Sequence, residues 1–214
     1  MTTRGKFITF EGIEGVGKST QVQRLADGLR ACGHTVVCTR EPGGAPLAEA
    51  VRDLLKYSPH ETITPSAELL LIFAARAAHA EALLRPALEA GSWVVCDRFV
   101  DASIAYQGAG RGLGRDRVMD LAAWVVPDLV PDLTLVLDLP LELAFSRLDA
   151  RGARDRFEQE EPAFFERVRK AYLEQAEREP RRVHVIDAAG EVDAVAARCR
   201  SVVEDYLAQA GRHD

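Results

Sequence analysis

Nine consecutive residues near the N-terminus, 12–20, combine glycines with a lysine and two hydroxyl side chains, a set suited to holding phosphate. They read GIEGVGKST and match the pattern G-x-x-x-x-G-K-[ST]. The glycines let the chain turn tightly, so that successive backbone N–H groups point at phosphate oxygens. The lysine adds a positive charge, the serine can reach Mg²⁺, and the N-terminus of a following helix favours an anion. The pattern predicts a nucleoside triphosphate site.

One residue of this loop needs an explanation, because Glu14 brings a negative charge to a place that should hold negative phosphates. An ionised carboxylate accepts hydrogen bonds and cannot donate them, so a hydroxyl is a suitable partner and a phosphate is not. The whole predicted triphosphate site is Gly12, Ile13, Glu14, Gly15, Val16, Gly17, Lys18, Ser19 and Thr20.

Composition indicates a globular protein and limits its partners. The chain has 214 residues, 47% of them apolar and 28% charged, which is enough for a single domain over 1–214. A formal net charge of −6 argues against a nucleic-acid partner. No apolar run approaches a membrane span. The four cysteines have neither paired nor metal-like spacing, so we expect reduced thiols and a cytoplasmic location.

Short runs rich in β-branched residues recur between segments of helical length. They do not alternate polar and apolar side chains, so both faces of the sheet they form should be covered. Thr64-Pro65 predicts the start of a helix, and Gly33 and Gly91 predict the ends of two others. We therefore predict an α/β fold, a five-stranded parallel sheet flanked by helices. The predicted strands are 6–11, 35–39, 93–97, 133–139 and 183–187.

Several further stretches are similar to the thymidylate kinase family, over essentially the whole chain. They are FEGIEGVGKSTQ at 10–21, TREPGG at 39–44, ELLLIFAARAAH at 68–79, DRFVDASIAYQGAGRG at 97–112, PDLTLVLDLP at 131–140 and RGARDRFE at 151–158. The glycine-rich loop is shared with many families, whereas TREPGG followed by DRF…AYQG…GRG is far more specific. The resemblance implies a P-loop NTPase fold that transfers the γ-phosphate of ATP to dTMP. The products would be dTDP and ADP, in dTTP synthesis for DNA replication.

The resemblance also assigns the residues that align two anionic nucleotides, as phosphoryl transfer requires. Lys18 and the loop amides are expected to hold ATP, with Mg²⁺ bound through Ser19. Arg98 matches the arginine that holds the acceptor phosphate, for which its planar fork is suited. Asp97 ends a strand at the edge where ligands of such sheets bind, and either acts on Mg²⁺ through water or orients Arg98. Glu14 is implied to face the acceptor and contact its 3′-hydroxyl.

The polar segment 147–160 resembles the short, mobile, arginine-rich lid of the bacterial class. Gly15 stands where some members have an arginine, so the positive charge for the transition state should come from this lid. Arg147 and Arg151 are four residues apart and share a helical face. Arg151 and Arg156 match the catalytic lid arginines best.

The lid also departs from the family pattern at two positions. Asp149 stands where an arginine is frequent, and Arg154 appears at an extra position. Which arginine reaches the γ-phosphate is therefore left open at this stage.

The helix expected over 68–79 should line the pocket for the base. Arg76 matches an arginine that hydrogen-bonds a thymine carbonyl, and in the family an aromatic side chain one turn earlier stacks on the base. Phe73 and Ile72, three and four residues before Arg76, can both share its face. Phe73 is the preferred stacking residue, with Ile72 as the alternative.

Further acceptor-site residues come from two other motifs. In DASIAYQG, the family's positions around base and sugar are Ser103, Tyr106 and Gln107. The Gln107 amide can donate and accept, which suits a pyrimidine edge, and Tyr106 should crowd a ribose 2′-hydroxyl. In TREPGG, Pro42 should stiffen the loop beside the sugar, and Glu41 has two readings, an aid to Mg²⁺ or a partner of Arg98.

Two other classes of function fit the phosphate loop. Another nucleoside monophosphate kinase, or a deoxynucleoside kinase, would use the same loop. Such an enzyme would not account for the presence of Arg76, Tyr106 and Gln107 together. A P-loop switch or ATPase is the second, and a GTP-binding switch would need an N-K-x-D motif that the sequence lacks. The family further implies a homodimer.

Overall fold

The five predicted strands form one all-parallel sheet in the described part of the chain, residues 4–57, 63–152 and 155–210 of a computed structural model. The sheet order is β2-β3-β1-β4-β5, and every neighbouring pair is parallel. The central strand β1 is buried along its whole length, which explains the absence of polar alternation. The strands are β1 Phe7–Glu11, β2 Val36–Arg40, β3 Trp93–Asp97, β4 Leu133–Asp138 and β5 Val183–Asp187.

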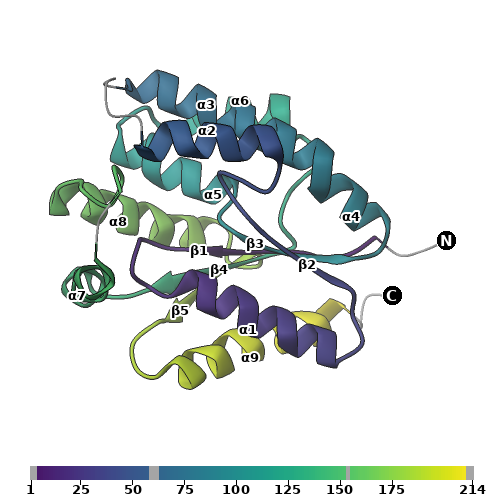
Figure 1. Cartoon of the computed structure of the whole chain (residues 1–214). Coiled ribbons are helices and arrows are strands. Elements are labelled where there is room, and N and C mark those ends of the chain that lie inside the picture. Colours follow the sequence, from purple (N-terminus) through teal and green to yellow (C-terminus); the bar gives the residue numbers. More distant parts are fainter. Residues whose placement is uncertain (1–3, 58–62, 153–154, 211–214) are drawn as a thin grey trace.

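Helices cover both faces of this sheet, as Figure 1 shows. Helices α1 and α9 lie together on one face. On the other face α8 packs against β4 and β5, α4 packs against β3, and α3, α5 and α6 lie on the same side of the sheet. The helices are α1 Lys18–Ala31, α2 Pro46–Tyr57, α3 Pro65–His79, α4 Arg85–Glu89, α5 Val100–Ser103, α6 Arg115–Val125, α7 Leu141–Arg151, α8 Pro162–Arg178 and α9 Val192–Ala210.

Local sequence signals set several of these boundaries. The Thr64 side chain accepts a hydrogen bond from the Ala67 N–H, and Pro65 occupies the first turn, so α3 begins where predicted. Gly33 follows the end of α1 with a φ of +91°. Two π-helical turns, η1 Ala80–Leu84 and η2 Ile104–Gly110, continue α3 and α5 without a break. Such turns are frequent at functional sites, and η2 carries part of the predicted acceptor site.

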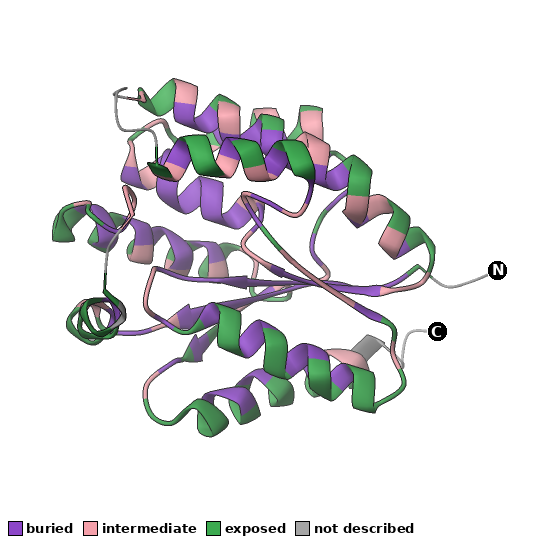
Figure 2. Ribbon diagram, viewed as in Figure 1, coloured by how far each residue is buried: buried purple, intermediate pink, exposed green. Residues whose placement is uncertain are grey.

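The core lies on both sides of the sheet. One cluster of buried side chains joins β1 and β4 to α1, α8 and α9, and a second joins β1 and β3 to α3, α4 and α6. Figure 2 shows the central strands β1, β3 and β4 almost entirely buried, the edge strands β2 and β5 buried only in part, and the outer helix faces exposed. In the described residues no helix has the length and apolar character to cross a membrane.

The strand order determines where a ligand can bind. The chain passes from β1 to β2 on one side of the sheet and later from β3 across β1 to β4 on the other side, so the carboxyl ends of β1, β3 and β4 border a crevice. The register pairs Phe10 with Asp97, which brings the phosphate loop after β1 beside the end of β3.

Candidate active site

The phosphate loop between β1 and α1 needs its glycines for close contact with the rest of the fold. Gly12 and Gly15 have φ of +126° and +77°, in the region that other residues avoid. A Cβ on Gly12 would lie 2.4 Å from the Leu137 carbonyl oxygen, and one on Gly15 would lie 2.3 Å from the Ala144 carbonyl oxygen. An arginine at Gly15 would therefore collide with α7, which is a physical reason for its absence.

Lys18 begins α1 and lies over the loop. Its Nζ donates hydrogen bonds to the carbonyl oxygens of Gly12 and Ile13, at 3.1 and 2.7 Å. Burial, together with the nearby Arg98 charge, lowers the pKa of Lys18 from 10.5 to about 8. An anionic ligand in the loop would oppose both effects and favour the charged amine.

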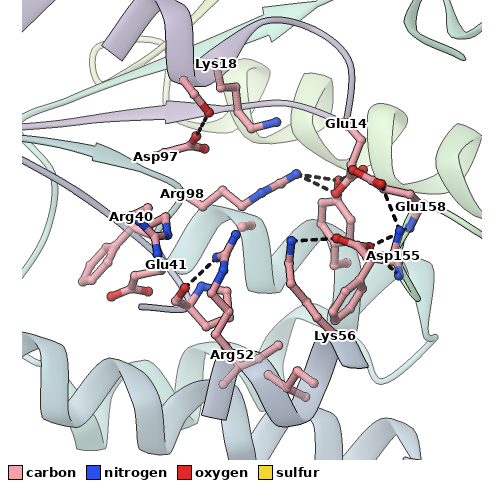
Figure 3. Close-up of a pocket in the computed structure, with 18 of the residues that line it drawn as sticks. Glu14, Lys18, Arg40, Glu41, Arg52, Lys56, Asp97, Arg98, Asp155 and Glu158 are labelled. Carbon is pink, nitrogen blue, oxygen red and sulfur yellow. Dashed lines mark hydrogen bonds and ion pairs between the residues drawn. The ribbon is translucent and has the colours of Figure 1, made fainter. Parts of the chain in front are cut away.

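Two oxygen-bearing side chains meet beside the loop. Ser19 Oγ donates a 2.9 Å hydrogen bond to Asp97 Oδ2, which joins the start of α1 to the end of β3 (Figure 3). A hydroxyl and a carboxylate are donors that suit Mg²⁺, which is usually held by one or two protein oxygens plus phosphate and water. In the part of the chain that the structure describes, no three or more histidine, cysteine, aspartate or glutamate side chains are grouped so that they could hold a metal ion.

Arg98 is the most connected cation of the site and has the left-handed φ of +75°, which is unusual for a residue with a side chain. Its Nη1 donates to the Gly12 carbonyl oxygen at 3.0 Å and to Tyr172 Oη at 3.2 Å. Its Nη2 donates to Glu14 Oε1 at 2.8 Å and to Tyr106 Oη at 3.0 Å. The guanidinium is thereby directed at the loop from the side of β3.

The Glu14 carboxylate faces this arginine (Figure 3). Glu14 accepts from Arg98 and also from Tyr106 Oη, which donates at 2.6 Å. A guanidinium thus balances the negative charge of Glu14, which explains how a carboxylate is tolerated in the phosphate loop. Its predicted contact with a sugar hydroxyl stays a prediction.

A buried carboxyl group supports Arg98 through neighbouring residues. It was not predicted from the sequence. Glu11, the last residue of β1, accepts hydrogen bonds from the Phe99 N–H at 2.8 Å and from Tyr172 Oη at 2.7 Å. Burial, with a contribution from nearby Asp101, raises the pKa of Glu11 to about 8. A single polar residue at the end of the apolar run KFITFE was the only signal for it.

A cavity of about 430 Å³ opens over these groups and extends to α2, α3 and η2. The loop and Lys18 line one end of it, and helix side chains line the other. The residues on its wall include Glu14, Gly15, Gly17, Lys18, Ser19, Thr20, Glu41, Pro42, Ile72, Arg76, Asp97, Arg98, Ser103, Tyr106 and Gln107. Predicted residues from four separate motifs are therefore brought together.

Arg76 lies at the far end of the cavity and is only 2% exposed. Its Nε donates to Glu41 Oε2 at 2.7 Å, and its Nη2 donates to the Phe99 carbonyl oxygen and Ser103 Oγ, both at 3.0 Å. Its Nη1 is buried and has no hydrogen-bond partner among the described residues. A buried unsatisfied donor on a cavity wall is suited to a ligand oxygen.

Glu41 has different partners from those that the sequence suggested. Besides Arg76, its Oε1 lies 2.9 Å from His79 Nδ1, and both Glu41 and His79 are buried. The carboxylate thus supports α3 rather than pairing with Arg98.

The prediction that Phe73, rather than Ile72, stacks on the base does not match the geometry. Phe73 is 2% exposed and belongs to the core cluster that contains Phe7 and Phe99, and it is not part of the cavity wall. Ile72, the alternative, lines the cavity. Phe73 instead packs against the Arg76 guanidinium, 4.5 Å from its ring centre, so it supports the arginine from the core side.

The predicted lid region lies against α2 and α3. Arg156 Nε donates to the Leu55 carbonyl oxygen at 2.8 Å, and its Nη2 donates to Glu68 Oε2 at 2.7 Å. Lys56 Nζ and Asp155 Oδ2 are 2.6 Å apart and meet across the cavity in Figure 3. In this arrangement Arg156 serves as a contact between the lid and the helices.

The other lid arginines occupy separate places. Arg147 lines the cavity and donates to the Ala188 carbonyl oxygen at 3.3 Å. Arg151 is the last residue of α7 and its side chain lies outside the described part, as does all of Arg154.

Three further cations on the cavity wall were missed in the sequence: Arg40 at the end of β2, and Arg52 and Lys56 on α2. Arg52 Nη1 donates to the Pro42 carbonyl oxygen at 2.7 Å. Burial and the nearby Arg40 charge lower the pKa of Arg52, and the carboxylates of Glu49 and Asp97 oppose this shift only in part. The signal available was the four-residue spacing of Arg52 and Lys56, which directs both to one face of α2.

A parallel sheet, a glycine-rich phosphate loop at its carboxyl edge and a cation-lined cavity define a P-loop enzyme that acts on nucleotides. A model of the thymidylate kinase family matches residues 10–199. A thymidylate kinase from Chromohalobacter salexigens is 54% identical over 208 residues, covering 96% of this chain and 98% of that one. One from Bordetella pertussis is 50% identical over 210 residues, covering 98% and 100%.

The crystal structure of a thymidylate kinase from Ehrlichia chaffeensis is similar in fold, with a TM-score of 0.77 and 34% identity, over 94% of this chain and 99% of that chain. The chain belongs to the thymidylate kinase family. It is accordingly a kinase, as the sequence motifs predicted.

Proposed function

We propose that this enzyme transfers the γ-phosphate of ATP to the 5′-phosphate of dTMP, giving dTDP and ADP. The observation that carries the proposal is the single cavity that joins a phosphate loop to the buried free donor of Arg76. Two anionic nucleotides laid end to end in this cavity would meet between Lys18 and Arg98. No general base is needed, because an acceptor phosphate is already an anionic nucleophile.

At the donor end, the loop amides of residues 12–20 and Lys18 bind the ATP phosphates. Ser19 and Asp97 are the residues that would hold Mg²⁺, since their oxygens lie together beside the loop. The bound ion would neutralise charge on the β- and γ-phosphates.

At the acceptor phosphate, Arg98 is the principal cation, with Arg52 facing the same cavity from α2. A phosphate there would replace Glu14 as the partner of Arg98. The released carboxylate would then be available to accept a hydrogen bond from the sugar 3′-hydroxyl.

The base lies at the Arg76 end. Arg76 Nη1 donates to the 4-carbonyl oxygen of thymine, Gln107 reads the N3 position, and Ile72 covers the ring face. Ser103 holds Arg76, and Glu41 and Pro42 shape the adjoining wall. Tyr106, fixed by Glu14 and Arg98, blocks a ribose 2′-hydroxyl.

The segment 147–160 acts as a lid that excludes water and so limits hydrolysis of ATP. Arg147 already lines the cavity, and Arg151 and Arg156 are further candidates to reach the transferring phosphate. For Arg156 this role requires release from Glu68, with which it is now paired.

Exposed apolar side chains on neighbouring helices support the proposal of a homodimer. Leu47 and Leu54 on α2, Leu70 on α3 and Trp124 on α6 are all exposed, Trp124 by 79%. Helix α3 contacts both α2 and α6, so one partner surface could cover them together. Light scattering on the purified chain would give the mass of a dimer or refute this assignment.

The reaction is tested by measuring ADP release with ATP and Mg²⁺ in the presence of dTMP, dUMP, dCMP or AMP. We expect dTMP to give the highest kcat/KM. Faster turnover of another nucleotide would assign the enzyme to another monophosphate. Substantial ADP release without any acceptor would instead support a P-loop ATPase.

A further inference from the structure

Glu68 is a fully buried carboxylate in the first turn of α3 that the proposed reaction does not use. Its Oε1 accepts from Gln107 Nε2 at 2.8 Å and from Arg111 Nε at 3.2 Å. Its Oε2 accepts from Arg111 Nη2 at 3.2 Å and from Arg156 Nη2 at 2.7 Å. Two guanidiniums and an amide thus hold both oxygens in place.

This carboxylate determines which way the Gln107 side-chain amide is turned. An amide has one donor end and one acceptor end, and a carboxylate paired with two guanidiniums can only accept. The nitrogen of Gln107 must therefore face Glu68. The other end, Oε1, accepts no hydrogen bond among the described residues, and Gln107 lies on the cavity wall. An acceptor is thus left for a ligand.

Arg76 supplies a donor at the same end of the cavity as this acceptor. Ser103, which accepts from Arg76 Nη2, is four residues before Gln107 on the same helical stretch, so the two side chains share a face. Arg76 adds its free Nη1 to the same end of the cavity. The wall therefore presents one donor and one acceptor to a ring edge.

We propose that Glu68 is a positioning residue that sets this polarity, and so selects a pyrimidine with an N3–H and a 4-carbonyl over one with the reverse pattern. Thymine offers a donor at N3 and an acceptor at position 4, and both match. Cytosine offers an acceptor at N3 and a donor amine at position 4, and both are opposed. The inference rests on the proposed site for the base, to which Glu68 makes no direct contact.

The test is Glu68→Gln. The glutamine side chain at position 68 has one acceptor oxygen, and Arg111 and Arg156 compete for it. Its amide nitrogen therefore faces Gln107, and the Gln107 amide rotates so that its oxygen accepts from that nitrogen. The Gln107 nitrogen, a donor, then faces the N3 position of the base. We expect the ratio of kcat/KM for dTMP to that for dCMP to fall about tenfold, as for one buried polar group left unpaired.

Glu160→Gln is the matched control. It removes the negative charge that pairs with Arg111 and leaves Gln107 in contact with Glu68, so the ratio should stay unchanged.

A folded Glu68→Gln enzyme with the wild-type ratio would overturn the inference, and so would an equal fall in the control. A wild-type enzyme that does not prefer dTMP to dCMP would overturn the proposed function, and this inference with it. If the variant does not fold, a neutron crystal structure of the wild-type enzyme with dTMP decides, because the amide hydrogens distinguish the nitrogen of Gln107 from its oxygen. We expect Gln107 Oε1 toward N3 and Nε2 on Glu68, and the opposite amide orientation would refute the role of Glu68.

Discussion

Binding of ATP should be accompanied by uptake of protons, because Lys18 is only partly charged in the ligand-free enzyme. Its pKa of about 8 means that half of the molecules carry a neutral amine at pH 8. Triphosphate oxygens in the loop favour the charged form and raise this pKa again. The complex therefore binds more protons than the free enzyme, and affinity for ATP falls as pH rises above 8.

The size of the effect follows from the pKa alone. If the bound amine stays fully charged, uptake per site is about 0.1 proton at pH 7, about 0.5 at pH 8 and about 0.9 at pH 9. Above pH 8 the dissociation constant should rise by up to about tenfold per pH unit. Calorimetry with Mg²⁺ and a non-hydrolysable ATP analogue, in buffers of different ionisation enthalpy, measures the uptake directly.

Glu11 also has a pKa of about 8, so a control is needed. Lys18→Arg keeps a cation in the loop that stays charged throughout this pH range. The uptake assigned to Lys18 should disappear in this variant. Equal uptake in both proteins, or none in the wild type at pH 8, would refute the reasoning.

Three other predictions concern the acceptor end of the cavity. Arg98→Ala should lower kcat/KM for dTMP by at least about 100-fold, since charged hydrogen bonds are worth about 1.5–3 kcal/mol each. Its affinity for an ATP analogue should change little, and unchanged turnover would remove Arg98 from its role. Ribothymidine 5′-monophosphate should react at least about tenfold more slowly than dTMP, and Tyr106→Ala should narrow this gap where Tyr106→Phe does not. Glu41→Gln should lower the free energy of unfolding by about 3 kcal/mol in urea titrations, because it leaves the buried Arg76 charge without its carboxylate.

Much of the fold was predictable because its signals are local. Strands covered on both faces have continuous apolar runs, and each of the five begins within one residue of its predicted start. The phosphate loop, Asp97 and Arg98 follow strands directly, so finding the strands also located these residues.

The rest of the site depends on how helices are rotated and which of them meet. Phe73 and Ile72 satisfy the same spacing from Arg76, and only the packing of α3 directs Ile72 to the cavity. Glu68 and Arg156 are 88 residues apart in sequence, and no local pattern connects them. The sequence therefore could not show that Arg156, one of the two arginines that matched the family best, pairs with α3 in this structure.

Arg98 is already fully engaged before any nucleotide arrives, through Glu14, two phenols and a backbone carbonyl. An acceptor phosphate that binds Arg98 as proposed would displace Glu14, and a doubly charged group does so far more readily than a neutral mimic. A competitive inhibitor without a phosphate therefore has more to gain at the Arg76 end, where a donor has no partner to lose. For medicinal chemistry, the deep end of this cavity is the better starting point.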